Sequence, residues 1–189
     1  MIIVGSGAIG IEFAYFYNSL GTDVTVVEFQ DRIAPNEDHE ISKELEKILK
    51  KKNINILTSS KVVSSEISND KVKVEIECKD NNLELVSDVV LSAVGIKSNI
   101  EDIGLEQIGV KVESDKILVN EFYKTNIDGI FAIGDIVSGQ SLAHVASAEG
   151  ITCVEYIKGL NPHPIDYNNI PGCTYSKPAV SYTHLTLPT

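Results

Sequence analysis

The 189-residue sequence has no tryptophan and only three cysteines, Cys78, Cys153 and Cys173. The cysteines lie far apart without CxxC spacing, which predicts reduced, mostly buried thiols in a cytoplasmic protein and neither a metal site nor a catalytic thiol pair. There is no long uncharged apolar run, and no basic residue precedes Arg32. We therefore expect no membrane span and no secretory signal.

Basic residues are also scarce, since 16 Lys and Arg stand against 27 Asp and Glu and the formal net charge is -11. This balance argues against nucleic acid or an anionic membrane surface as a partner. The one basic run, Lys50–Lys52, ends a predicted helix, where the helix dipole favours cations. We interpret it as a solvated helix end.

The start of the chain carries the most informative pattern. An apolar run, Ile2–Val4, leads into GSGAIG at residues 5–10, and a β-branched run, Val24–Val27, ends at the acidic Glu28. Between them, apolar residues at helical spacing precede Gly21, which predicts a helix stopped by a glycine. These residues are Ile9, Phe13, Phe16 and Leu20. Strand, glycine turn, helix, strand and acid in this order predict a dinucleotide-binding βαβ unit.

Each glycine has a mechanical role in such a unit. Gly5 allows the tight turn, Gly7 lets the backbone approach a pyrophosphate, and Gly10 lets helix and strand pack closely. The helix N-terminus faces the phosphates. Glu28 is placed to accept hydrogen bonds from a ribose 2′-hydroxyl and to repel a 2′-phosphate, so the pattern predicts NAD rather than NADP. The alternative is a glycine-rich turn in an ordinary α/β protein.

The elements after Glu28 complete a Rossmann-like α/β domain with a parallel sheet and a small antiparallel meander. A helix and a buried strand come first, then three alternating runs, then an apolar run that predicts a strand buried on both faces. In order, the predicted ranges are loop 29–36, helix 38–51, strand 54–57, meander strands 61–67, 71–78 and 83–86, and strand 88–94. We expect the domain to end at about residue 118.

A second candidate nucleotide site follows. Ile130–Ile133 predicts a short buried strand that ends in Gly134 and Asp135, and Ser141 is placed to cap a helix over residues 142–157. Ligands of open α/β sheets bind just outside strand carboxyl ends, so Asp135 and this helix start are positioned for a nucleotide. The alternative is that Asp135 only caps the segment after it.

Five stretches together resemble the flavoprotein disulfide reductases, and most closely their dihydrolipoamide-oxidising members: GSGAIGIEFAYFY, VTVVEFQDRIAP, LSAVG, TNIDGIFAIGDI and LAHVASAEGI. The resemblance extends to about residue 180. It implies an NAD-binding domain over 1–118, the second half of a split FAD-binding domain over 119–160 and the start of an interface domain over 161–180. Residues 181–189 do not continue the family pattern, so we interpret them as a non-native tail.

The resemblance also implies roles for individual residues. On the NAD side these are Gly5, Ser6, Gly7, Ala8, Ile9, Gly10 and Glu12 along the pyrophosphate and nicotinamide, Glu28 at the adenosine ribose, Val62 near the adenine and Gly95 where the backbone passes the nucleotide. On the FAD side they are Asp135 at the ribityl chain and Ser141, Leu142, Ala143 and His144 at the helix start near the flavin pyrimidine edge. A helix N-terminus there stabilises the negative charge of reduced flavin.

In this family the redox cysteine pair and the catalytic histidine and glutamate lie in other segments, so we expect an interior fragment without catalytic residues of its own. The resemblance implies a homodimeric parent enzyme that passes electrons from a lipoyl-bearing protein or a small dithiol through a cysteine pair and FAD to NAD. Two alternatives stay open. One is another FAD- and NAD-linked disulfide reductase or an NADH oxidase, and the other is a free-standing NAD-binding module without catalysis.

Overall fold

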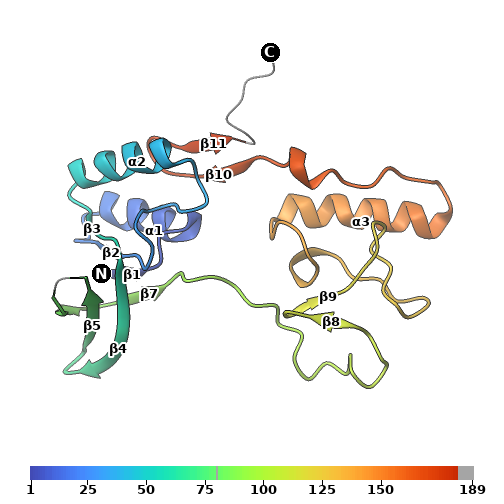
Figure 1. Ribbon diagram of the computed structural model, residues 1–189, viewed down its shortest axis with the longest axis horizontal. Coiled ribbons are helices and arrows are strands. Elements are labelled where there is room, and N and C mark those ends of the chain that lie inside the picture. Colours follow the sequence, from blue (N-terminus) through green and yellow to red (C-terminus); the bar gives the residue numbers. More distant parts are fainter. Residues whose placement is uncertain (80, 183–189) are drawn as a thin grey trace, which may run out of the picture. The chain divides into compact units, whose positions relative to one another are not determined.

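The computed structural model describes residues 1–79 and 81–182. The backbone forms two compact units (Figure 1). The first contains residues 1–95 and the C-terminal segment from Pro171, and the second contains residues 96–170. Within the described residues, no helix is long and apolar enough to cross a membrane.

A parallel four-stranded sheet forms the centre of the first unit, with the strand order β3-β2-β1-β7. The strands are β1 (Ile2–Val4), β2 (Thr25–Val27), β3 (Asn55–Leu57) and β7 (Val90–Ser92), and the helices that connect the first three are α1 (Ala8–Ser19) and α2 (His39–Lys51). In the central strand, Ile3 pairs with Val26 on one side and with Leu91 on the other. The predicted βαβ unit and its continuation into a third strand are confirmed.

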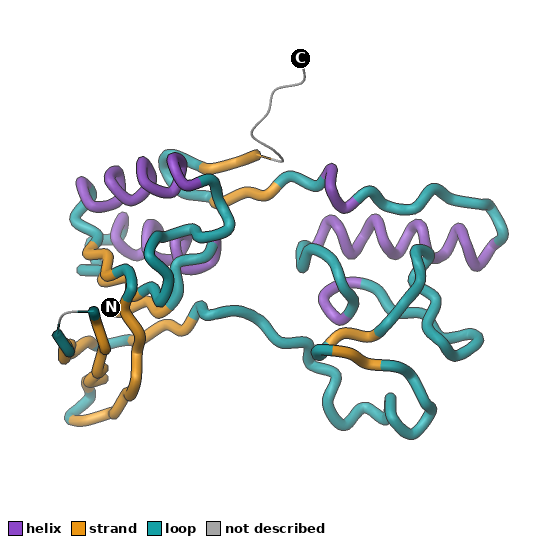
Figure 2. The backbone as a smooth tube through the Cα atoms, in the orientation of Figure 1, coloured by secondary structure: helices purple, strands orange, loops and turns teal. Residues whose placement is uncertain are grey.

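Both faces of this sheet are covered (Figure 2). Helices α1 and α2 lie on one face, where one buried cluster contains Ile3, Ile11, Ala14, Val26, Leu45, Leu49 and Ile56. The other face packs on an antiparallel meander through a cluster of Ile2, Val27, Val74 and Ile76. The meander consists of β4 (Ser60–Ser68), β5 (Lys71–Cys78) and β6 (Leu83–Ser87). The predicted α/β class, with a parallel sheet and an antiparallel meander, is confirmed.

A C-terminal hairpin completes the first unit. Its strands, β10 (Gly172–Thr174) and β11 (Val180–Tyr182), pair antiparallel, and Val180 joins the buried cluster beneath α1 and α2. Ser181 is the first residue of the predicted tail, and it pairs with Cys173 in this hairpin. Residues 183–189 of that tail lie outside the described residues.

The helical stripe predicted for α1 does not face the sheet. Ile9, Phe13, Phe16 and Leu20 are 40–69% exposed. The buried residues of α1 are instead Gly10, Ile11 and Ala14. Small residues allow the helix to approach the strands closely, so the close packing on this face comes from glycine and alanine rather than from the aromatic residues.

Two further expectations for the first unit are corrected. β7 lies at the edge of the described sheet, and its residues are half-buried or exposed rather than buried on both faces, because among the described strands it pairs only with β1. The cysteines are free as expected, but only Cys153 of the second unit is buried, whereas Cys78 and Cys173 are partly exposed.

The second unit contains less regular structure. Its elements are the hairpin β8 (Val112–Glu113) and β9 (Lys116–Ile117), the short 3-10 helices η1 (Gly134–Ile136) and η2 (Tyr167–Asn169), and helix α3 (Ala143–Lys158). Its core contains Ile100, Val110, Ile117, Ala132 and Val137. The predicted helix is confirmed as α3, with Gly159 in the left-handed conformation at its C-terminus.

Two predictions in this unit are wrong. Residues 130–133 do not form a strand, because their only ladder contact in the described structure is an isolated bridge from Lys124 to Phe131. Ser141 does not cap α3, because the N-cap position is taken by Leu142, and no side chain caps the helix.

Candidate nucleotide-binding sites

A cleft of about 670 Å³ lies in the first unit at the carboxyl ends of β1 and β2. Six of the predicted NAD residues line it: Gly5, Ser6, Gly7, Glu28, Val62 and Gly95. The other four, Ala8, Ile9, Gly10 and Glu12, belong to α1 and are not among its lining residues. The structure therefore brings together residues from four separate segments of the chain at the edge of the sheet where α/β proteins bind ligands.

The glycines of this cleft have the backbone geometry that the sequence predicts. Gly5 has φ +96°, and a Cβ there would lie 2.5 Å from the carbonyl oxygen of Ala93. A Cβ on Gly10 would lie 2.1 Å from the carbonyl oxygen of Gly5. Gly7, the N-cap of α1, has open space within 4 Å of its Cβ position. Gly5 and Gly10 are thus required for close packing of the backbone. Gly7 instead leaves room at the helix N-terminus, and this room fits a pyrophosphate.

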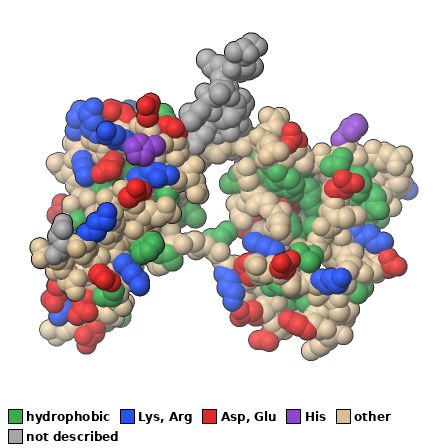
Figure 3. Space-filling model, viewed as in Figure 1, with side chains coloured by type: hydrophobic (Ala, Val, Ile, Leu, Met, Phe, Trp, Pro, Cys, Tyr) green, Lys and Arg blue, Asp and Glu red, His purple; other side chains and the backbone are tan. Residues whose placement is uncertain are grey.

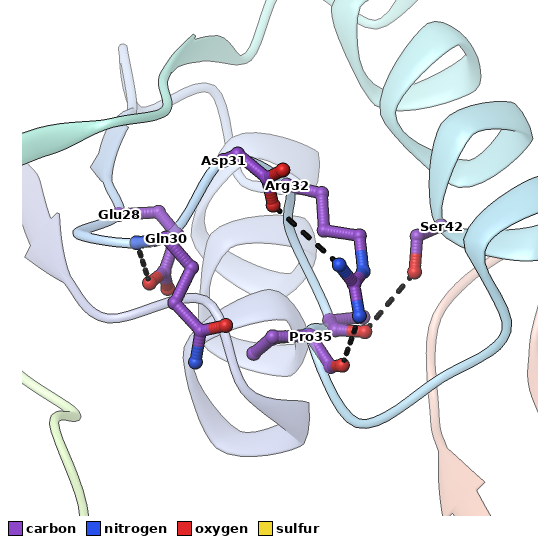
Figure 4. A network of polar contacts seen from close by, with 7 residues as sticks. Glu28, Gln30, Asp31, Arg32, Pro35 and Ser42 are labelled. Carbon is purple, nitrogen blue, oxygen red and sulfur yellow. Dashed lines mark hydrogen bonds and ion pairs between the residues drawn. The ribbon is translucent and has the colours of Figure 1, made fainter.

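Glu28 is only 6% exposed, and its carboxylate is held by three donors. Oε2 accepts hydrogen bonds from the backbone N of Ser6 at 2.8 Å and from its Oγ at 2.6 Å. Oε1 accepts from the backbone N of Gln30 at 2.8 Å, as Figure 4 shows. A carboxylate can accept about four hydrogen bonds, so Glu28 keeps capacity for one more donor, such as a ribose hydroxyl.

Arg32 lies four residues after Glu28 but is directed elsewhere. Its guanidinium donates to the carbonyl oxygen of Pro35 at 2.9 Å and forms an ion pair with Asp31 at 3.5 Å. Figure 4 shows it turned toward Pro35 rather than toward Glu28. Lys61 does line the cleft, whereas Arg32 does not. The cleft therefore presents a fixed buried carboxylate and one exposed lysine.

Glu12 has a different environment from the glycine turn. Its Oε1 accepts a hydrogen bond at 2.9 Å from the backbone N of Tyr175, in the loop of the C-terminal hairpin. The two residues line a shallow groove of about 400 Å³ together with Phe13, Tyr15 and Phe16. A nicotinamide contact by Glu12 stays a prediction.

In the second unit, Asp135 lies in η1 with an exposed side chain. Its backbone carbonyl accepts hydrogen bonds from the Oγ of Ser98 at 3.0 Å and from the Nζ of Lys116 at 2.6 Å. These bonds fix the backbone at Asp135 and leave its carboxylate facing solvent.

The start of α3 is also open. Ser141, Ala143 and His144 are exposed, Leu142 is partly buried, and no side chain caps the helix. The first amides of a helix have no intrahelical partner, so this terminus can bind the electron-rich edge of a ligand. Within the described residues, no cluster of His, Cys, Asp or Glu could hold a metal ion.

Sequence reasoning assigned no role to Glu149, which is 1% exposed. Its Oε2 accepts a hydrogen bond from the backbone N of Gly134 at 2.6 Å, and its Oε1 accepts one from the hydroxyl of Tyr167 at 2.6 Å. A signal was available, because Glu149 lies four residues after the buried Val145 and four before the buried Cys153, on the core side of α3. A glutamate at such a position requires partners.

Comparison with known proteins decides the family. A family model for pyridine nucleotide-disulphide oxidoreductases matches residues 1–150. The chain belongs to this family. The dihydrolipoyl dehydrogenase of Rhizobium etli is 46% identical over 188 residues, which cover 98% of this chain and 39% of that protein. The chain thus spans about two fifths of the length of this relative.

Solved structures with a similar fold were also found. LpdA from Mycobacterium tuberculosis matches with a TM-score of 0.87 and 26% identity over 95% of this chain and 39% of that one. A cysteine-to-serine mutant of RclA, an HOCl-induced flavoprotein disulfide reductase from Escherichia coli, matches with a TM-score of 0.87 and 25% identity over 95% of this chain and 40% of that one. Members of this family typically bind FAD and NAD.

Proposed function

We propose that this chain is part of an NAD-dependent dihydrolipoyl dehydrogenase. Residues 1–118 are its NAD-binding domain, residues 119–160 contribute the second segment of its FAD-binding domain, and residues 161–180 begin its interface domain. The parent enzyme oxidises a lipoyl-bearing protein or a small dithiol, and it acts as a homodimer in the cytoplasm. The 46% identity to the Rhizobium etli dihydrolipoyl dehydrogenase supports this substrate class.

The assignment of a nicotinamide nucleotide as ligand rests mainly on the cleft that contains Glu28. Its glycine turn leaves space in front of the N-terminus of α1, and its buried carboxylate keeps acceptor capacity for a ribose hydroxyl. A 2′-phosphate would meet that carboxylate, and Arg32, which could neutralise it, is bonded to Pro35. These contacts favour NAD over NADP.

The residues of the chain bind and orient the cofactors. Bound nicotinamide and flavin supply the hydride chemistry, which no protein side chain supplies. Gly5, Ser6 and Gly7 would hold the turn at the pyrophosphate, and Glu28 would accept a hydrogen bond from the adenosine ribose. In the second unit, Asp135 would bind the ribityl chain of a flavin, and the amides at the start of α3 would donate to its pyrimidine edge.

Titration of the chain with NADH and NADPH, followed by nucleotide fluorescence, tests this assignment. We expect NADH to bind more tightly by about 10- to 100-fold, because a hydrogen bond to a charged group contributes about 1.5–3 kcal/mol. Equal affinities would remove Glu28 as the residue that distinguishes the two nucleotides.

Two other functions are supported by particular observations. The match to RclA favours a different disulfide reductase in the same family, which assays of the parent enzyme with several disulfide substrates distinguish. The first unit contains its nucleotide cleft entirely within itself, which favours a free-standing NAD-binding module. A parent protein that binds NADH but no FAD would support that second alternative.

A further inference from the structure

Glu149 is a buried acidic residue that the nucleotide contacts proposed above do not use. It lies in the second turn of α3, where the helix passes the loop that carries Gly134 and Asp135. Its two oxygens accept hydrogen bonds at 2.6 Å from the backbone N of Gly134 and from the hydroxyl of Tyr167. The hydroxyl of Tyr167 is in turn 3.1 Å from that of Tyr123.

The donors and acceptors in this hydrogen-bond network can be assigned in one consistent way. A backbone N–H can only donate, and the tyrosine hydroxyl donates to the carboxylate, so both Glu149 oxygens act as acceptors. Tyr123 can then donate to Tyr167. Burial raises the pKa of the Tyr167 phenol, and its hydrogen bond to Glu149 raises it further, so Tyr167 keeps its proton. The carboxylate is thus held by two donors that do not lose their protons near neutral pH.

The contact to Gly134 fixes the backbone next to Asp135. Gly134 has φ +76°, which favours glycine, and its Cβ position lies 3.4 Å from the Cβ of Ala146 on α3. The side chain of Ile133 packs against the same helix at Gly150. A Cβ on Gly150 would lie only 3.3 Å from the Cδ1 of Ile133. Glu149 therefore ties the loop before Asp135 to the helix whose first residues form the other half of the candidate flavin site.

We propose that Glu149 is a positioning residue for the flavin site. It holds the Gly134 amide and so fixes Asp135 relative to the start of α3, without touching the flavin itself. The proposal rests on the flavin role assigned to the second unit above. Because Glu149 acts on two flavin-binding elements at once, its loss affects flavin binding more than nucleotide binding in the first unit.

The first experiment tests the contact in the 189-residue chain. Glu149→Gln keeps the shape but offers only one acceptor oxygen to two donors. We expect the amide proton resonance of Gly134 to move upfield in the NMR spectrum of this variant. Glu155→Gln is the matched control, because Glu155 lies on the same helix and its side chain has no hydrogen bond to the loop among the described residues. A Gly134 resonance that is the same in both variants overturns the contact.

The second experiment measures FAD and NADH affinity in the full-length parent protein. We expect Glu149→Gln to weaken FAD binding about tenfold and to leave NADH binding unchanged, with Glu155→Gln equal to the wild type in both. Equal loss of FAD and NADH affinity would indicate a general structural role and overturn the proposal, as would unchanged FAD affinity. If the wild-type parent binds no FAD, the proposed function fails together with the flavin role of Glu149, whereas the Gly134 resonance reports on the contact alone.

Discussion

Ser6 shows how a single residue connects the parts of the NAD cleft. It is fully buried, and both its backbone N and its Oγ donate to Glu28. Its carbonyl accepts a hydrogen bond at 2.8 Å from the backbone N of Ala34, in the loop after β2. Both of its donors are thus directed at Glu28, so we expect Ser6 to support nucleotide binding by orienting that carboxylate.

Replacing Ser6 with alanine tests this role. Ser6→Ala removes the 2.6 Å bond from Oγ and keeps the backbone bond, so Glu28 stays in place but is held less firmly. We expect NADH affinity to fall about 2- to 10-fold, since one hydrogen bond contributes about 0.5–1.5 kcal/mol. Isothermal titration measures it. Ser19→Ala, at the exposed end of α1, is the control, and equal affinities for the two variants would refute the role of the hydroxyl.

At the scale of elements, the glycines of the turn before α1 are expected to have different roles. Gly10 is needed for packing, whereas Gly7 is expected to be needed for ligand binding. A Cβ on Gly10 would collide with the backbone of Gly5, which cannot move aside as a flexible side chain would. We expect Gly10→Ala to lower the free energy of unfolding by about 1–3 kcal/mol. Gly7→Ala meets no atom within 4 Å and changes stability by less than about 1 kcal/mol, the cost of a poorer N-cap.

Nucleotide binding should rank these two variants differently. In Gly7→Ala, the new methyl group would lie where a pyrophosphate is expected to approach the helix N-terminus. We therefore expect Gly7→Ala to weaken NADH binding. The loss should be at least as large as that measured for the Gly10→Ala molecules that remain folded. Urea unfolding and NADH titration of both variants give the comparison. A Gly7→Ala chain with full NADH affinity would place the pyrophosphate elsewhere.

The buried tyrosines of the second unit make its stability depend on pH. Burial raises the pKa of Tyr123, and burial together with the bond to Glu149 raises that of Tyr167. In the unfolded chain both ionise near their ordinary pKa of about 10. The folded unit then binds more protons than the unfolded chain above that pH. The stabilisation is therefore complete below about pH 10 and decreases as the pH rises through the folded pKa values.

Urea unfolding at about pH 8 and about pH 11, followed by far-UV circular dichroism, measures this effect. We expect Tyr167→Phe to reduce the loss of stability at high pH and to lower stability at neutral pH by about 1–3 kcal/mol, because Glu149 loses a donor. Tyr175→Phe is the control, since Tyr175 is 72% exposed. Equal pH dependence in all three proteins would contradict the prediction.

Local sequence patterns predicted the first unit well and the second poorly. The βαβ unit, α2 and the meander follow from spacing and turn residues that act within one element. The exposed face of α1 was not predictable from periodicity, because its aromatic residues and the small residues that pack on the sheet both recur at helical spacing. Residues 130–133 have strand-like composition but no neighbouring strand in the described structure beyond one bridge.

In the candidate sites, too, features set within one element could be predicted, whereas contacts between elements could not. The glycine turn before α1 and the carboxylate after β2 are specified locally, so Gly5, with its positive φ, Gly7 at the helix N-cap and Glu28 could be predicted. The bond from Ser6 to Glu28 spans 22 residues, and that from Gly134 to Glu149 spans 15. Such contacts depend on how elements meet in space, so the partners of Glu149 could not be predicted from the sequence, although its position on the core side of α3 could.

At the scale of the whole molecule, large apolar side chains remain exposed in both units. On α3 these include Ile151, Val154 and Ile157, each about 60% exposed, and hydrophobic side chains are visible on the surface of the second unit in Figure 3. Contiguous apolar surface of this kind is typical of interaction sites. It agrees with a chain that spans about two fifths of its relatives.

The purified chain should be colourless and should lack dihydrolipoamide dehydrogenase activity. The chain would contribute only Asp135 and the start of α3 to a flavin site, and so few contacts would not offset the entropy that a bound flavin loses. Cys78, Cys153 and Cys173 are free and widely spaced in the sequence, so we expect them not to supply the thiolate pair that dithiol oxidation requires. Visible absorbance after incubation with FAD, and an assay of NAD reduction by dihydrolipoamide, test both expectations.

The full-length parent protein should show both properties. We expect it to carry a CxxxxC pair before the segment that corresponds to Met1 and a histidine–glutamate pair after the segment that ends near Val180, to bind FAD, and to reduce NAD with dihydrolipoamide. The two units of this chain would then supply nucleotide contacts, and the added segments would supply the thiolate nucleophile and the base. A parent that carries the cysteine pair but prefers another disulfide substrate would keep the family and exclude dihydrolipoamide. A yellow stoichiometric complex of the 189-residue chain with FAD would instead show that the flavin site is complete within this chain.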